Sequence, residues 1–202
     1  MTVKFLSAAM LLACALPALA EPMDGTGWLI SCDDAGCRID SGGFALWTTP
    51  QSDPAAIAVL NALPSVSAIS FAGDLTNMSD ANADVTLTKA AHIDDQNEGN
   101  LQVLQGDWAP KGEEGQYFIR IVGLEWQEWQ DGEMQANFAM TVGDTCANGT
   151  TPGGGTVISL YRLGDDPDPD GCWQIEGITE QDMDLRDFQG EAGQVAYRRT
   201  TP

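Results

Sequence analysis

The sequence has little positive charge and almost no histidine. Its 202 residues include 9 Lys and Arg against 30 Asp and Glu, which gives a net charge of −21, and His92 is the one histidine. A chain this acidic repels nucleic acids and anionic lipid surfaces, so neither is an expected partner. The charge favours a cationic partner, although solubility outside the cell also accounts for it.

No apolar run long enough to cross a membrane follows the first twenty residues. Lys4 precedes an apolar run over residues 5–16, and Ala18-Leu19-Ala20 supplies the small residues of a cleavage site. This pattern predicts a signal peptide at 1–20 and a mature chain that begins at Glu21. Cleavage removes Lys4 and no acid, so the mature chain keeps 8 Lys and Arg, 30 Asp and Glu, and a charge of −22. We expect a periplasmic or secreted protein.

A second exported form is open at Cys14. Leu11-Leu12-Ala13-Cys14 loosely resembles the lipobox of bacterial lipoproteins, in which the cysteine is lipidated and becomes the new N-terminus. An outer-envelope lipoprotein attached through Cys14 is therefore the alternative to a protein without a lipid anchor.

Four cysteines follow the signal peptide, and an even number in an exported chain predicts disulfides. They are Cys32, Cys37, Cys146 and Cys172, which allow three connectivities. We favour Cys32–Cys37 with Cys146–Cys172, because each bond then closes a loop within its own half of the chain. The second bond requires the Gly-rich segment 147–155 to fold back, since the strand predicted between its cysteines spans about 26 Å. The spacings match no zinc ribbon or finger.

A polar run at residues 94–100 divides the mature chain into two parts. Such a run is typical of a loop, and we take 95–100 as a linker or loop. Residues 21–94 are predicted to form a small α+β portion. Its strands are expected at 28–31, 43–48, 68–73 and 84–90, and its one helix, capped by Ser52 or Asp53, at 54–63.

Residues 101–202 have the pattern of an antiparallel sheet. Apolar side chains occupy every second position from Met134 to Val142, and Asp131-Gly132 before them is a two-residue hairpin signal. The strands are expected at 117–122, 124–130, 134–142, 156–163, 172–178, 182–188 and 194–199. Short strands joined by tight turns predict a meander that closes into a small barrel or barrel-like sheet. The fold class is therefore mainly β, and α+β overall.

Two motifs in this half resemble those of a lipocalin-type, or calycin, β-barrel. Gly106-Asp107-Trp108 matches the Gly-x-Trp at which those barrels open, and Tyr197-Arg198-Arg199 supplies an arginine on the last strand, where the family packs one across that tryptophan. An arginine stacked on tryptophan closes the barrel bottom by a cation–π contact. The resemblance covers residues 106–200 and implies an interior that holds a small apolar ligand or is filled by its own side chains. No family resemblance covers residues 21–100.

Asp166, Asp168 and Asp170, followed by Gly171, reproduce the first half of a D-x-D-x-D-G calcium loop. In such a loop alternate carboxylates converge on the cation. The second half differs, because Gly177 stands where the pattern requires Glu. The segment therefore has two interpretations, a Ca2+ site and a solvated acidic hairpin loop.

Six tryptophans are many for a chain of this length, and most are expected to fill the core. Trp126 and Trp129 lie three residues apart in a predicted strand, so they should face opposite sides of the sheet. Trp129, beside the predicted hairpin, is the preferred exposed candidate. Trp126, Trp129 and Trp108 are the predicted ligand-binding residues, since such rings can stack on sugars or line an apolar pocket.

These features favour an exported, acidic, non-enzymatic binding protein. Its ligand would be a cationic partner, such as a basic secreted enzyme, or a small apolar molecule. The alternatives are a periplasmic hydrolase that depends on carboxylates or a bound cation, and a structural protein of the envelope. No recognisable motif supplies a nucleophile and a base together, and His92 is interpreted as a surface residue at a strand end.

Overall fold

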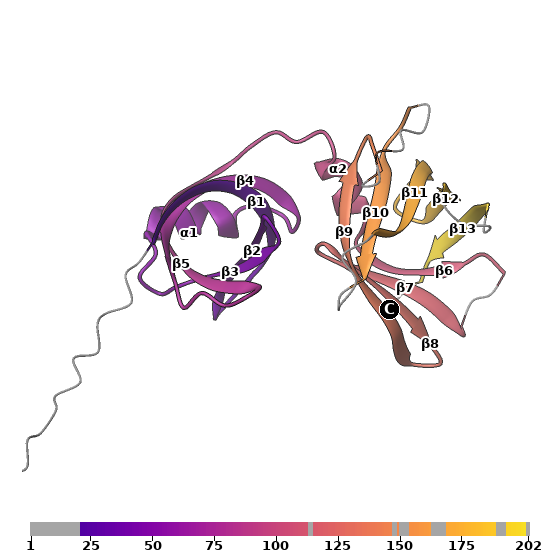
Figure 1. The fold of residues 1–202 in the computed structure, drawn as a ribbon, viewed down its shortest axis with the longest axis horizontal. Coiled ribbons are helices and arrows are strands. Elements are labelled where there is room, and N and C mark those ends of the chain that lie inside the picture. Colours follow the sequence, from indigo (N-terminus) through magenta and orange to yellow (C-terminus); the bar gives the residue numbers. More distant parts are fainter. Residues whose placement is uncertain are drawn as a thin grey trace, which may run out of the picture.

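The computed structural model describes residues 21–112, 115–146, 149, 154–162, 169–188 and 193–200, with the backbone alone at 169 and 170. These residues form a mainly β chain that contains two closed barrels, one from each half (Figure 1). The prediction of a mainly β fold with an antiparallel barrel in the C-terminal half is confirmed. The predicted signal peptide lies outside the described residues.

The N-terminal barrel has five strands and one helix. They are β1 (Glu21–Asp33), β2 (Gly36–Ser41), β3 (Phe44–Thr48), α1 (Pro54–Asn61), β4 (Ser67–Thr76) and β5 (Asn82–His92). The strand order is β1-β2-β3-β5-β4, β4 pairs back onto β1, and β3 and β5 are parallel. The sequence pattern indicated the helix and four of these strands, but neither β2 nor the closure of the sheet.

Local chemistry determines where α1 begins. The Asp53 side chain accepts a hydrogen bond from the Ala55 amide at 2.7 Å. Pro54 stands in the first turn, where a backbone N–H would have no acceptor within the helix, so proline breaks no hydrogen bond there. Ala56 and Leu60 are buried with the apolar side chains of the barrel. The helix therefore covers one side of the N-terminal core, as Figure 1 shows.

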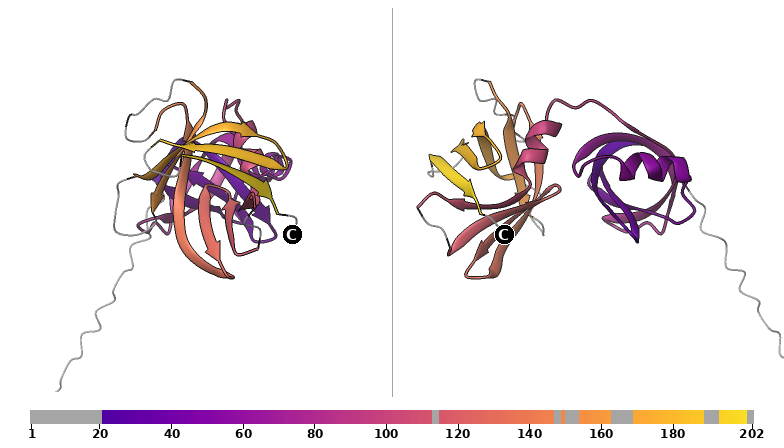
Figure 2. Two further views of the ribbon diagram at one scale, coloured as in Figure 1. Left: turned by 90° about the vertical axis from the view of Figure 1, so that its right-hand side faces the viewer. Right: turned by 180° about the vertical axis from the view of Figure 1, so that it is seen from behind.

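The stretch expected to be a linker is in part helical. α2 (Glu98–Leu104) begins within residues 95–100, and its Leu101 and Leu104 are buried. Two leucines three residues apart lie on one face of a helix, so burial of that face outweighs the polar character of the first turn. Figures 1 and 2 place α2 beside the C-terminal barrel, on the side toward the N-terminal barrel.

The C-terminal barrel is an eight-stranded meander. Its strands are β6 (Gly106–Pro110), β7 (Tyr117–Val122), β8 (Glu125–Gln130), β9 (Glu133–Gly143), β10 (Val157–Arg162), β11 (Pro169–Ile178), β12 (Asp182–Asp187) and β13 (Gln194–Arg199). Each pairs antiparallel with the next, and β13 closes onto β6. Asp131 and Gly132, between β8 and β9, both have positive φ, 53° and 82°, as a tight two-residue hairpin requires.

Both predicted disulfides are present. Cys32 and Cys37 are opposite one another in the β1–β2 ladder, with their Cα atoms 4.0 Å apart. Cys146 bonds Cys172 with a Cα separation of 5.8 Å. The distance along β10 is no obstacle, because β11 runs back antiparallel to it and places Cys172 opposite Ser159, near the start of β10.

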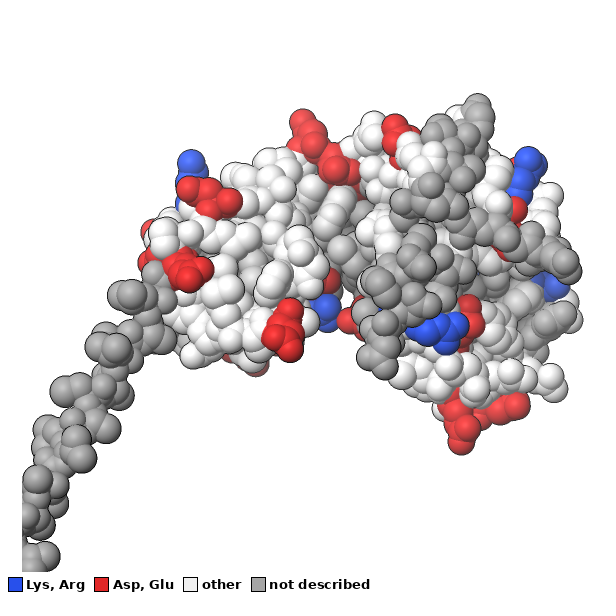
Figure 3. All heavy atoms as spheres, viewed as in Figure 1, with Lys and Arg blue, Asp and Glu red and all other residues white. Residues whose placement is uncertain are grey.

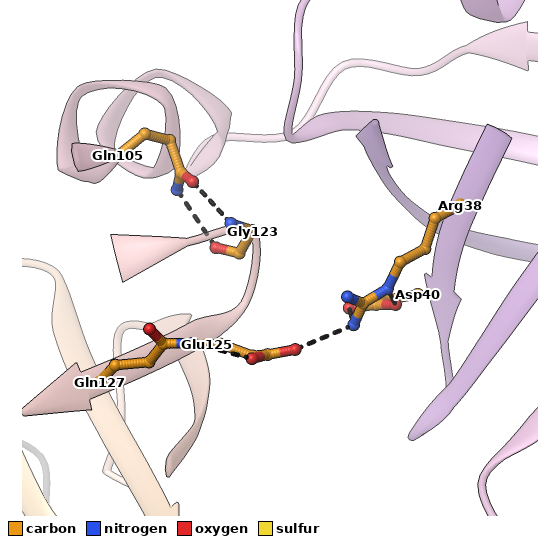
Figure 4. Close-up of polar contacts among 6 residues, drawn as sticks. All are labelled: Arg38, Asp40, Gln105, Gly123, Glu125 and Gln127. Atoms are coloured by element: carbon orange, nitrogen blue, oxygen red, sulfur yellow. Dashed lines mark hydrogen bonds and ion pairs between the residues drawn. The ribbon is translucent and has the colours of Figure 1, made fainter. Parts of the chain in front are cut away.

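The two barrels contact each other through polar and apolar groups. Gly123, in the turn between β7 and β8, fits against Ile30 of β1 so closely that a Cβ at this position would lie 2.7 Å from the Ile30 side chain. Beside it, the Arg38 guanidinium donates to Glu125 at 3.2 Å, and Gln105 exchanges two hydrogen bonds with the main chain of Gly123 (Figure 4). The contact of Ile30 with Gly123 and the ion pair of Arg38 with Glu125 join the N-terminal barrel to one end of the C-terminal barrel, and Gln105 fixes the Gly123 turn.

Candidate ligand site in the C-terminal barrel

The chain closes one end of the C-terminal barrel with its own residues. The Arg199 guanidinium lies 4.4 Å from the centroid of the Trp108 ring, and it donates to the main-chain oxygens of Val103, Gln105 and Glu180. Val103 and Gln105 are at the C-terminal end of α2, where exposed carbonyl oxygens favour a cation. The arginine-on-tryptophan closure that the resemblance implied is therefore observed.

The neighbouring strands determine which side chains face the interior. Trp126 on β8 is opposite Ile121 on β7, and Glu128 is opposite Ile119. Both isoleucines are almost completely buried in the barrel core. Directly opposed side chains share a face, so Trp126 and Glu128 face the interior with them.

The indole N–H of Trp126 has no hydrogen-bond acceptor among the described residues. The side chain is 1% exposed and lies in the apolar core of the barrel. By contrast, the equally buried Trp108 donates its N–H to the Leu104 oxygen at 2.7 Å. A buried donor without an acceptor costs about 1–3 kcal/mol, and in native proteins such a group usually bonds water or a ligand. Trp126 therefore offers an unused donor inside the barrel.

Two tyrosines flank the interior carboxylate Glu128. Burial, and then the negative charge of Glu128, raise the pKa of both Tyr117 and Tyr197 above the ordinary value. The Tyr117 hydroxyl also forms a hydrogen bond with the carboxylate. Both phenols therefore stay neutral at physiological pH.

Charged side chains also stand at the end of the barrel opposite Trp108. Arg162 is opposite Phe138 in the β9–β10 ladder, and its guanidinium lies 5.1 Å from the centroid of the Phe138 ring. Asp187 is opposite Trp173 in the β11–β12 ladder, so both face inward with the core. This end, which we call the far rim of the barrel, thus combines aromatic rings with charges of both signs.

Trp129 lies on the outer face of the barrel, as its spacing from Trp126 predicts. Its ring stacks on Phe118 with centroids 5.9 Å apart and planes within 5°. The Arg120 guanidinium lies 5.4 Å from the Phe118 centroid and 5.3 Å from that of Trp129, and Asp107 holds it with two hydrogen bonds of 2.8 Å. Trp129 is thus part of a surface stack, while Trp126 and Trp108 are buried.

The predicted calcium site cannot be placed in full. Asp166 and Asp168 lie outside the described residues, and Asp170 is described only by its backbone, in β11. Within the part of the chain that the structure describes, no three His, Cys, Asp or Glu side chains are grouped to hold a metal ion. The four predicted disulfide cysteines are paired as expected.

His92 takes part in a contact between the barrels. Its ring lies 3.0 Å from Glu98 of α2, which also accepts a hydrogen bond from the Ala68 amide at 3.1 Å. Ser67 hydrogen-bonds the same carboxylate. In a Ser-His-acid catalytic triad the histidine lies between the serine and the acid, whereas here the acid lies between the serine and the histidine. This group therefore lacks the order of a catalytic triad.

A groove of about 330 Å³ lies at one end of the N-terminal barrel. The β1–β2 hairpin that carries Asp33 and Asp34 forms one wall, and the segment from Thr48 to α1 forms the other. The Cys32–Cys37 disulfide braces this hairpin. The groove is acidic, so it suits a cationic group better than a phosphate.

Sequence reasoning missed Glu128, Tyr117 and Tyr197 as interior residues. Glu128 stands two positions after Trp126, and the two share a face because side chains alternate along a strand. That spacing is a usable signal. Glu128 has no predicted role in the sequence analysis.

No helix among the described residues is both long and apolar enough to cross a membrane. The likeness to lipocalin-type barrels rests on the two short motifs and on the meander of strands. Comparison of the chain with protein-family models finds no match, and neither does comparison with curated proteins or with solved structures.

Proposed function

We propose that this chain is an exported, non-enzymatic binding protein whose C-terminal barrel holds one small, largely apolar ligand. The observation that carries the proposal is the unpaired indole N–H of Trp126 inside that barrel. Eight strands enclose a space that side chains can just fill or that can hold one small ligand. A polar donor left without an acceptor in such a core favours the second case.

The barrel geometry supports binding from one end. Arg199, Trp108 and α2 occupy the other end, next to the N-terminal barrel. The ligand would enter at the far rim near Arg162 and Asp187 and reach Trp126 past Glu128. Apolar side chains around it, such as Phe138 and Ile119, would contribute burial of its apolar surface.

Export is supported by the leader pattern at residues 1–20 and by the two disulfides, which form and persist outside the reducing cytoplasm. A non-enzymatic role is supported by the position of His92, whose ring bonds the Glu98 carboxylate between the barrels.

A cationic partner is the second candidate, and the acidic groove beside Asp33 and Asp34 favours it. In the view of Figure 3 acidic side chains are spread over both barrels with few cations among them. A spread of charge attracts cationic molecules generally, whereas the groove would take a single Lys or Arg side chain.

Native mass spectrometry of the full chain, expressed with its leader in a bacterial host, tests the proposal. We expect a small molecule retained by the native protein and released on denaturation. Ala136→Phe should abolish retention, because Ala136 is opposite Glu128 and a large ring there fills the interior. Thr141→Phe, at an exposed position of the same strand, should retain the adduct. If Ala136→Phe keeps it as well, the ligand does not lie in the barrel.

A further inference from the structure

We propose that the ligand of the C-terminal barrel is an organic amine, bound as its ammonium ion by Glu128 with its apolar body among the aromatic side chains of the interior. This inference rests on the proposed function and adds the chemical class of the ligand. The groups that would select it are the carboxylate of Glu128, the rings around it and the donor of Trp126.

The first argument is the placement of a carboxylate in an apolar barrel. Glu128 shares its face with Trp126 and lies between Ile119 on β7 and Ala136 on β9. A carboxylate in such surroundings requires charged or hydrogen-bonding partners. Tyr117 supplies one hydrogen bond, and a carboxylate has about four acceptor sites. An ammonium group, with three donors, would use those that remain.

The second argument is the aromatic lining. Trp126, Phe138 and Tyr197 are buried in the barrel core, and Tyr117 and Trp173 pack against the same core. Aromatic faces attract cations, and recognition of organic ammonium ions by such rings is a common use of this attraction. Arg162 already places a guanidinium over the Phe138 ring at 5.1 Å, so the far rim accommodates a cation on an aromatic face.

The third argument is the balance of charge toward the far rim. Glu128 and Asp187 face inward from β8 and β12, and among the inward-facing residues of the described strands Arg162 is the one cation toward this end. Arg162 and Asp187 each have further interactions of their own. The summed charge is negative, which favours an amine over a carboxylic acid of the same shape.

Trp126 adds a requirement for an oxygen on the ligand. Its N–H needs an acceptor, and Trp126 and Glu128 are two residues apart on one strand, which is about 7 Å. An amine that also carries a hydroxyl or carbonyl oxygen at about that distance would satisfy both groups. A purely hydrocarbon amine would satisfy Glu128 alone.

Isothermal titration of the full chain with 2-phenylethylammonium and with 2-phenylethanol tests this class. The two probes have the same apolar body, so the proposal predicts that the amine binds at least about tenfold more tightly, as expected for a charge-assisted hydrogen bond. Glu128→Gln should abolish that preference. Glu133→Gln, which removes an exposed carboxylate at the start of β9, should keep it. The wild-type comparison requires no variant, so the test remains decisive even if Glu128→Gln does not fold.

The outcomes separate this inference from the proposed function. Equal binding of amine and alcohol overturns the amine class and leaves a barrel that binds small molecules. If neither probe binds but the native protein retains a molecule that is not an amine, the amine class is likewise overturned and the proposed function remains. Absence of binding by both probes and of any retained adduct overturns the class and the proposed function together. A preference for the amine that survives Glu128→Gln would show that another group selects the cation.

Discussion

The two barrels differ in whether their buried polar side chains have hydrogen-bond partners. In the N-terminal barrel the buried serines and the buried threonine all have hydrogen-bond partners. The pairs are Ser41 with the Thr26 oxygen, Thr48 with the Cys37 amide, Ser52 with the Leu87 amide and Ser67 with the Pro64 oxygen. In the C-terminal barrel the described interior has the unpaired Trp126 donor and the inward carboxylate of Glu128. Two closed barrels in one chain thus have cores of different kinds.

The difference indicates a division of roles. A core whose polar groups are all satisfied needs no further molecule, and the N-terminal barrel is in that state. The C-terminal barrel keeps an unsatisfied donor at a cost to its own stability, and such groups are typical of functional sites. This difference is the basis of our proposal that the C-terminal barrel binds the ligand and that the N-terminal barrel, with the acidic groove on its surface, supports it.

The contrast between the two barrels assumes that Arg199 closes one end of the C-terminal barrel through contacts within the chain. Arg199→Ala removes the stack on Trp108 and three hydrogen bonds to main-chain oxygens, so it should lower the free energy of unfolding by about 3 kcal/mol. Arg198→Ala, the exposed neighbour on the same strand, should cost less than about 0.5 kcal/mol. Urea unfolding measures both, and equal losses would contradict this account of the closure.

The two disulfides offer a second comparison, since one lies in each barrel. Cys146–Cys172 closes a loop with a sequence separation of 26, and Cys32–Cys37 one with a separation of 5. Loop entropy then predicts losses of about 3.5 and about 2 kcal/mol when each pair is replaced by serine. Thermal unfolding of the two double variants would show the order, and the reverse order would mean that the hairpin disulfide matters through native contacts instead.

Trp108 and Trp126 form a matched pair for the buried donor. Both are fully buried, but Trp108 donates to the Leu104 oxygen, whereas Trp126 has no acceptor. Phenylalanine at either position loses similar apolar contact, and at 108 it also leaves a carbonyl oxygen without its donor. In ligand-free protein we expect Trp108→Phe to be more destabilising by about 1–2 kcal/mol. Equal losses in chemical denaturation would indicate that the Trp126 N–H is already bonded.

The smallest effect concerns the contact between the barrels. The pKa of Glu98 is lowered, because the Ala68 amide and His92 together outweigh the effect of burial, which is the largest single influence and acts to raise it. A lowered pKa contributes stability that is fully present above the unfolded value, about 4.3, and is lost as the pH falls through the folded value. Glu98→Gln should therefore flatten the loss of stability below that pH. Glu133→Gln, at an exposed position, is the control and should leave the profile unchanged.

The sequence predicts seven of the eight strands of the C-terminal barrel, because the turns between strands have distinctive residues and several strands have a clear period; β6, the first strand, was not among them. Asp131-Gly132 and the alternation from Met134 to Val142 are local signals of this kind. The closure of the N-terminal barrel was not predictable in the same way, since the parallel pairing of β3 with β5 joins residues that are far apart in the chain.

The candidate site was predicted only in part. Trp126 was named from its spacing to Trp129, but its unpaired N–H depends on what the other strands place around it. Tyr197 comes close to Glu128 because β13, the last strand of the barrel, pairs with β6, its first strand. A linear pattern contains no information about such contacts, so the polar group inside the barrel became visible only in three dimensions.

The most direct test of the account is the indole N–H resonance of Trp126 in a nitrogen–proton correlation spectrum, assigned by its loss in Trp126→Phe. Titration with 2-phenylethylammonium and 2-phenylethanol should shift this resonance and leave that of Trp47, which is 43% exposed on the N-terminal barrel, unchanged. That result would place the ligand inside the C-terminal barrel. A Trp126 resonance that stays fixed at saturation, or shifts no more than that of Trp47, would contradict the central claim.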